Sequence, residues 1–120
     1  MRFLLLTGAL VLAGCSHEAP LPPAPTPADI ARAETAHPVD AALADKYSRS
    51  CRLCHSVAGT GAPLAGHRPS WQPRVDARGI DGLLASVHGG RGAMPARGQC
   101  PDCTDADYRA LIRFLSGGAA

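Results

Sequence analysis

Aromatic side chains are scarce in this chain of 120 residues, where one Trp, two Tyr and two Phe make up 4% of the composition. Hydrophobic residues nevertheless reach 46%, and the length leaves room for one domain with a compact core. A domain of this size buries only a limited share of its surface. Its core therefore needs apolar volume from a source other than large aromatic rings.

The chain also has little net charge. Twelve Lys and Arg residues against ten Asp and Glu residues give a formal charge of +2, and the basic residues form no run or stripe. Proteins that bind nucleic acids usually carry such a basic surface. Nucleic acid is therefore excluded as an expected partner.

No hydrophobic run is long enough for a transmembrane helix. The apolar stretch at positions 3–12 has ten residues, half of the roughly 20 that a spanning helix needs. After the positive start Met1-Arg2 it predicts a secretion signal. Leu12-Ala13-Gly14-Cys15 resembles a bacterial lipobox, so we expect a signal peptide over 1–14 and a lipid on Cys15. An ordinary signal peptide cut near Ala13 is the alternative.

Proline is abundant in the next segment. Residues 16–38 hold six prolines and few large apolar side chains, a composition that cannot form a core and favours extended polyproline conformation. We therefore expect a lipidated Cys15 and a Pro/Ala-rich linker over 15–38, with an upper reach of roughly 70 Å at about 3.1 Å per residue. The folded domain would then occupy residues 39–120.

Apolar residues at helical spacing predict helices in this domain. Asp40 is a candidate cap for a helix with Val39, Leu43 and Tyr47 on one face. Near the other end, Thr104 with Asp107 three residues later has the pattern of a capping box. It precedes a second apolar face, formed by Tyr108, Leu111, Ile112 and Leu115.

A further short helix is predicted by the apolar spacing between residues 80 and 87, and Gly89-Gly90 ends it. Residues 56–78 are rich in Gly and Pro and are expected to form a loop. No segment has a convincing strand pattern. The predicted fold class is all-α, with three to four short helices.

The most specific pattern is Cys51-Arg52-Leu53-Cys54-His55. Two cysteines separated by two residues and followed by histidine suit covalent attachment of a c-type haem. Met94, followed by Pro95, is expected opposite the histidine, because a thioether opposite an imidazole gives the six-coordinate iron of an electron-transfer cytochrome. His88 is the rival for that position, but it lies six residues before Met94 at a predicted helix end. A large apolar cofactor would also explain the scarcity of aromatic residues.

Cys100 and Cys103 form a second close pair, which leaves none of the five cysteines without an assignment. A zinc site made with the first pair is one alternative, but the 45 intervening residues exceed the usual spacing of roughly 15 to 20. A redox dithiol is another, since a helix N-terminus lowers the pKa of a thiol. A structural disulfide in an oxidising compartment is the third and favoured interpretation.

Together these features resemble the class I c-type cytochromes, most closely the small bacterial cytochrome c5 type. The resemblance runs from about Val39 to Leu115. The motifs that carry it are Tyr47 before the haem motif, Gly61-Ala62-Pro63, Trp71, Gly79, Gly92-Ala93-Met94-Pro95, and the cysteine pair that follows.

The resemblance implies a role for individual residues. Cys51 and Cys54 would carry the haem thioethers, and His55 and Met94 would be the axial iron ligands. The Pro63 carbonyl would accept the other ring N–H of His55, which fixes the orientation of the imidazole. The remaining implied roles belong to Trp71 and Arg74 near a haem propionate, Leu64 packed on the ring, and Cys100 and Cys103 as a structural disulfide.

The function implied is one-electron transfer through one covalently bound haem c, and not an enzyme activity. The expected partners are redox proteins of a respiratory chain, namely a quinol-oxidising complex or dehydrogenase on one side and a terminal oxidase or reductase on the other. The expected location is the bacterial cell envelope, facing the periplasm, with a lipid anchor in the inner or outer membrane. The alternative is a haem enzyme or gas sensor in which Met94 does not bind iron or is easily displaced.

Overall fold

The structure, a computed structural model, describes residues 20–118. It contains five α-helices and one short 3₁₀-helix: α1 (Pro27–Thr35), α2 (Ala41–Arg49), α3 (Arg52–His55), α4 (Arg68–Gly89), η1 (Ala96–Gln99) and α5 (Asp105–Leu115). The all-α prediction is confirmed, with more helices than the three to four expected. The predicted signal peptide and the lipidated Cys15 lie outside the described residues.

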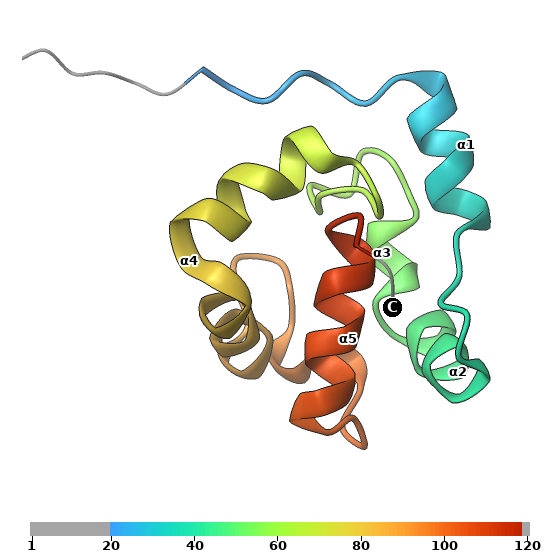
Figure 1. The fold of residues 1–120 in the computed structure, drawn as a ribbon, viewed down its shortest axis with the longest axis vertical. Helices are drawn as coiled ribbons and strands as arrows, with labels where there is room; N and C mark the ends of the chain where they lie inside the picture. The colour runs from blue at the N-terminus through green and yellow to red at the C-terminus, as the bar shows by residue number, and fades with distance from the viewer. Residues whose placement is uncertain (1–19, 119–120) are drawn as a thin grey trace, which may run out of the picture.

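The helix α5 runs through the middle of the molecule (Figure 1), with α4 on one side and α1, α2 and α3 on the other. Its predicted apolar face is buried, including Tyr108, Leu111 and Leu115. Tyr47 from α2 is fully buried and meets Phe114 of α5 edge to face, with ring centroids 5.0 Å apart. These contacts build the core between the haem motif and the C-terminal helix.

Both predicted helix caps are present. The Asp40 carboxylate accepts a hydrogen bond from the backbone N–H of Leu43 at 2.8 Å, and Thr104 and Asp107 form a complete capping box. Asp107 also accepts a hydrogen bond from Lys46 Nζ at 2.6 Å, which joins the start of α5 to α2. The prediction that Val39 belongs to the apolar face of this helix is wrong, because Val39 is 93% exposed and the helix begins only at residue 41.

The loop predicted over residues 56–78 ends earlier than expected, because α4 begins at Arg68. Pro69 stands in the first turn, where a missing N–H costs no intrahelical bond. Gly79 takes a left-handed φ of 61° and divides α4 at a kink, a conformation that glycine adopts without strain. Figure 1 shows the resulting bend, which carries the second half of α4 alongside α5.

The prediction of extended polyproline conformation is wrong for α1. Thr26 and Asp29 form a capping box, and Pro27 occupies the first turn of the helix, where its fixed φ favours helical conformation. The alanines that follow are strong helix formers. Ala33 is completely buried in the core cluster, so α1 packs on the domain.

None of the helices in the described part of the chain is long and apolar enough to cross a membrane.

Candidate haem site

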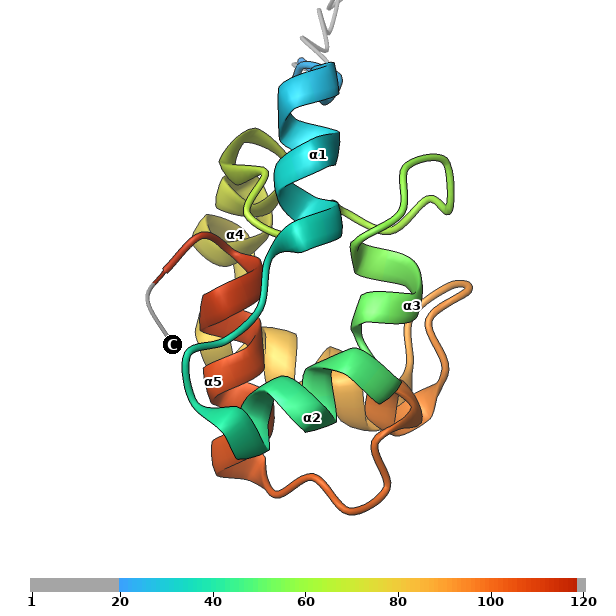
Figure 2. The ribbon, with the colours of Figure 1, turned by 90° about the vertical axis from the view of Figure 1, so that its right-hand side faces the viewer.

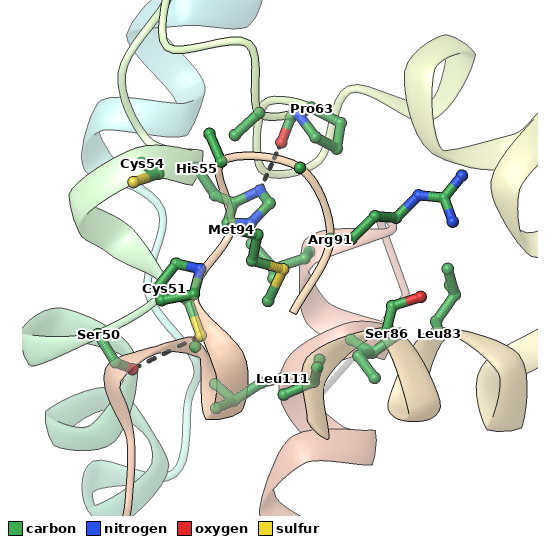
Figure 3. Close-up of a pocket in the computed structure, with 18 of the residues that line it drawn as sticks. Ser50, Cys51, Cys54, His55, Pro63, Leu83, Ser86, Arg91, Met94 and Leu111 are labelled. Atoms are coloured by element: carbon green, nitrogen blue, oxygen red, sulfur yellow. Dashed lines mark hydrogen bonds between the residues drawn. The ribbon is translucent and has the colours of Figure 1, made fainter. Parts of the chain in front are cut away.

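A cavity of about 580 Å³ opens between α3, α4, α5 and the segment 91–99. Its volume is in the range typical of sites for small molecules and cofactors. Cys51, Cys54, His55 and Met94 all line it. Figure 3 shows the His55 imidazole and the Met94 thioether in the same pocket, although the two residues come from distant parts of the sequence.

The two cysteines of the motif are free thiols at the start and middle of the short helix α3. The helix α2 ends before them at Ser50, whose backbone is not helical, and Cys51 then begins the next turn. Cys51 is half-buried and Cys54 is exposed. Burial raises the pKa of the Cys51 thiol, against the opposing effect of a hydrogen bond from Ser50. Both sulfur atoms therefore remain available for a covalent bond to a cofactor.

The histidine of the motif is buried and has a fixed orientation. Its Nδ1 atom lies 2.8 Å from the carbonyl oxygen of Pro63, and this oxygen can only accept a hydrogen bond. Desolvation lowers the pKa of His55, and the positive charge of Arg74 acts in the same direction, while the bond to Pro63 opposes them. The lowered pKa favours the neutral ring, and the acceptor at Pro63 favours a proton on Nδ1, which leaves the Nε2 lone pair free for a metal.

The methionine is presented by a tight turn. Arg91 and Met94 exchange two backbone hydrogen bonds of 3.0 Å. Gly90 precedes this turn with a φ of 76°, and a Cβ atom there would lie 2.9 Å from the Met94 carbonyl oxygen. Only glycine fits such a close approach, because it combines a positive φ with the absence of a side chain.

The turn that follows Met94 is fastened to α5. Cys100 and Cys103 form a disulfide, as the resemblance to cytochrome c5 implies. The Tyr108 hydroxyl donates to the Cys100 carbonyl oxygen at 2.6 Å and lies 3.2 Å from that of Arg97. The disulfide therefore closes the turn before α5, and the Tyr108 hydroxyl ties the chain beyond the methionine to α5.

His88, the rival ligand, does not line the cavity. Its Nε2 atom lies 2.9 Å from a carboxylate oxygen of Asp105, and its ring stands edge to face against Tyr108. The four-cysteine zinc site is also not assembled, since Cys100 and Cys103 are bonded to each other. The described residues contain no cluster of three or more His, Cys, Asp or Glu side chains that could hold a metal.

The predicted pocket residues are only partly where the resemblance implies. Trp71 lines the cavity, but its indole N–H donates to the Leu64 carbonyl oxygen at 2.8 Å, so this donor is not free for a propionate. Arg74 lines the cavity and donates to the Ser70 carbonyl. Leu64 is buried in the core and does not line this cavity, which differs from its predicted contact with the ring.

Sequence reasoning missed the apolar wall on the far side of the cavity. This wall consists of side chains from α4 and α5, namely Leu83, Val87, Leu111 and Leu115. Their helical spacing was recognised, but core residues and cofactor contacts have the same periodicity. Cofactor contacts differ from other core residues in lying near the haem motif in space, and the spacing of residues along the sequence does not show this proximity.

The residues present fit a covalently attached haem. One cavity is lined by two free thiols, an imidazole whose Nε2 is free to bind a metal, and a methionine thioether. Much of the remaining lining is apolar. These are the donor types of a c-type haem site with histidine and methionine ligands.

Comparison with known proteins gives a consistent result. Residues 39–115 match the family model described as cytochrome c oxidase, cbb3-type, subunit III. Cytochrome c5 of Azotobacter vinelandii is 40% identical over 74 residues, which cover 61% of this chain and 89% of that protein. Cytochrome c5 of Ectopseudomonas mendocina is 39% identical over 74 residues, covering 61% of this chain and 85% of that protein.

A solved structure also resembles the chain. It is described as an electron transfer complex of nitrite reductase with cytochrome c, and the matching chain is 36% identical with a TM-score of 0.57. The match covers 68% of this chain and 98% of that chain. The chain therefore belongs to the cytochrome c family, as a class I c-type cytochrome that binds one haem c covalently and serves as an electron carrier.

Proposed function

We propose that this protein is a membrane-tethered electron carrier of the bacterial envelope, with His55 and Met94 as the axial ligands of its haem. The observation that carries the proposal is that both side chains line one cavity together with Cys51 and Cys54. When bound in such a site, haem supplies reversible one-electron chemistry at iron.

The protein's own residues then have distinct tasks. Cys51 and Cys54 attach the cofactor, and the Pro63 carbonyl holds His55 in its ligating orientation. The links from Tyr108 and the disulfide hold the chain that follows Met94. If His55 and Met94 both bound the iron, no position would remain there for a substrate, and this favours a carrier over an enzyme or gas sensor.

The lipobox ending at Cys15 supports a lipid anchor and a location on the periplasmic side of a membrane. The helix α1 changes the expected length of the tether. Its N-cap is Thr26, so only residues 16–25 separate the lipidated cysteine from folded structure. At about 3.6 Å per residue these ten residues reach at most roughly 36 Å. The domain would thus meet partners close to the membrane surface.

The proposed partners are redox proteins that can supply or accept one electron in this location. The donor would be a quinol-oxidising complex or dehydrogenase, and the acceptor a terminal oxidase or reductase. The similar cytochrome c in a complex with nitrite reductase supports an acceptor of the reductase type. A lipid tether raises the effective concentration of the carrier near membrane-bound partners.

Optical spectroscopy of the haem-loaded protein tests the ligand assignment. We expect haem that resists acidic solvent extraction, and a weak long-wavelength ferric band from methionine ligation. Met94→Ala should lose this band and let the ferrous protein bind carbon monoxide, whereas the control His88→Ala should keep the band. Rapid binding of carbon monoxide by the unaltered ferrous protein would favour the sensor or enzyme alternative.

Cell fractionation tests the tether separately. The wild-type protein should remain with the membranes and be released by detergent. The variant Cys15→Ser removes the only thiol available for lipidation in the lipobox, so its mature product should lose this lipid-dependent, detergent-sensitive association. Equal lipid labelling of both proteins would contradict the anchor.

A further inference from the structure

The helix α1 lies outside residues 39–115, which match the family model, yet it is not free of the domain. Ala33 is completely buried in the core cluster, and Ile30 is packed against that cluster. A helix in a solvated linker would have no reason to bury one face. The N-terminal segment is therefore a docked element that this chain adds to the cytochrome domain.

A residue of the haem motif fastens the end of this helix. Arg52, directly after Cys51, donates from Nη2 to the Glu34 carbonyl oxygen at 3.0 Å. Carbonyl groups in the last turn of a helix lack intrahelical partners, and the negative end of the helix dipole attracts a cation. Arg52 therefore links α1 directly to the helix that carries both haem cysteines.

A second contact reaches the other helix beside the motif. The ring of His37 stands edge to face against Tyr47 of α2, with centroids 5.9 Å apart and an interplanar angle of 88°. Figure 2 shows α1 above both α2 and α3. The segment thus contacts both helices that flank Cys51.

The N-terminal segment also faces the loop that orients the histidine. A smaller cavity of about 360 Å³ is lined by Pro25 and Ile30 on one side and by Pro63 and Leu64 on the other. Pro63 supplies the carbonyl oxygen bound to His55 Nδ1. The docked segment therefore forms one wall of this cavity and occupies space from which water would otherwise approach the backbone on the histidine side of the haem site.

We infer that α1 is a proximal cap, which limits water access to the His55 side of the haem site and thereby raises the reduction potential. A more solvated site stabilises the extra positive charge of the ferric state, so solvent exposure lowers the potential. The inference rests on His55 as a haem ligand but not on the lipid anchor, the partner or Met94. It assigns a redox role to residues that the family model does not include.

A matched pair of substitutions in the haem-loaded full chain tests this inference. Ala33→Gln places a neutral but larger polar side chain at a buried position, and Ala31→Gln makes the same change at an exposed position of the same helix. Burial of an unpaired amide should undock the helix. We expect protection of α1 amides against hydrogen exchange to fall by roughly ten- to a hundredfold in Ala33→Gln, with a lower reduction potential. Ala31→Gln should change neither quantity.

The two readouts separate a redox role from a purely structural one. An undocked α1 with an unchanged potential would overturn the inference, and so would rapid exchange of the α1 amides in the unaltered protein. If Ala33→Gln does not accumulate with haem, the milder Ala33→Ser is measured by the same criteria. The ferric methionine band is recorded on each variant, so that loss of Met94 ligation is recognised as a separate event.

Discussion

The His55 imidazole donates its Nδ1 proton to the Pro63 carbonyl oxygen over 2.8 Å. This bond joins the haem motif to a loop eight residues later, and it determines which nitrogen of the ring remains free. Because the ring is buried, the proton has little access to solvent. Ring orientation and ligand basicity are both controlled by this single contact.

The first prediction concerns the exchange of that proton. In the diamagnetic ferrous protein labelled with ¹⁵N-histidine, the Nδ1–H of His55 should give an observable signal and exchange slowly with water. The rings of His37 and His88 are exposed, so their N–H protons should exchange rapidly and serve as internal controls. Exchange of the His55 proton at the same rate as the controls would show that the contact with Pro63 does not persist in solution.

The second prediction concerns Asp107, which joins α5 to α2. Its hydrogen bond with Lys46, followed by those with Thr104, lowers the pKa of this carboxyl from 3.8 to about 2. A carboxyl with a lowered folded-state pKa stabilises the protein above its unfolded pKa. That contribution is lost as the pH falls from about 4 towards 2. Asp107→Asn should therefore reduce stability by about 1 kcal/mol at neutral pH.

Denaturant unfolding at several pH values measures this effect. The difference between wild type and Asp107→Asn should shrink as the pH falls through the same range, because both side chains are then uncharged. Asp81→Asn is the control, since Asp81 pairs with Arg109 but is 86% exposed, and exposed pairs contribute little. A constant difference at all pH values would contradict the proposed ion pair.

The helices that were predicted correctly have complete local signals. The helix α5 combines an apolar spacing of three and four residues with a capping box at Thr104, and α2 has the same spacing after Asp40. The haem motif is likewise local, since all its chemistry lies within five consecutive residues. Such features depend on neighbours in sequence and can be recognised without the fold.

The failures involve contacts between distant residues. The helix α1 was missed because its prolines resemble a linker, and the burial of Ala33 depends on tertiary packing. The early start of α4 was missed because Pro69 and Pro73 resemble loop residues. The Trp71 indole N–H donates to the backbone oxygen of Leu64, and no pattern of side chains in the sequence predicts this hydrogen bond.

The third prediction concerns the turn that follows Met94. Arg97 and Gln99 both have φ angles of 61°, a left-handed conformation that is costly for side chains other than glycine. The Tyr108 hydroxyl donates to the Cys100 carbonyl beside this turn. Tyr108→Phe removes this bond, although the Cys100 carbonyl keeps the backbone N–H of Cys103 at 3.0 Å, and should cost about 1 kcal/mol. The freed turn should also let cyanide replace Met94 on ferric iron faster.

Tyr47→Phe is the matched control for this prediction. Tyr47 is fully buried like Tyr108, but its hydroxyl has no hydrogen-bond partner among the described residues. Removing a hydroxyl that makes no bond should leave stability unchanged or raise it. Equal losses in the two variants, or unchanged cyanide binding in Tyr108→Phe, would show that the hydroxyl does not hold the methionine loop.

The fourth prediction separates two residues that the family resemblance placed at a propionate. Trp71 is 6% exposed and gives its N–H to the Leu64 carbonyl, so Trp71→Phe should cost about 1–3 kcal/mol of stability and change the reduction potential little. Arg74 is exposed at the cavity mouth. Arg74→Gln should leave stability nearly unchanged and lower the potential, because a nearby positive charge disfavours the ferric state.

Denaturant unfolding and potentiometric titration of the two variants test this separation. Trp71 stacks near His55, with ring centroids 5.5 Å apart, so its main contribution is to pack the ligand and close the loop at Leu64. A large fall in the reduction potential of Trp71→Phe without a loss of stability would contradict this separation. It would indicate that the indole interacts with a propionate, as the family resemblance implies. A fall in stability together with a constant potential would instead identify Trp71 as structural support for the histidine, with Arg74 as the charged residue that acts on the iron.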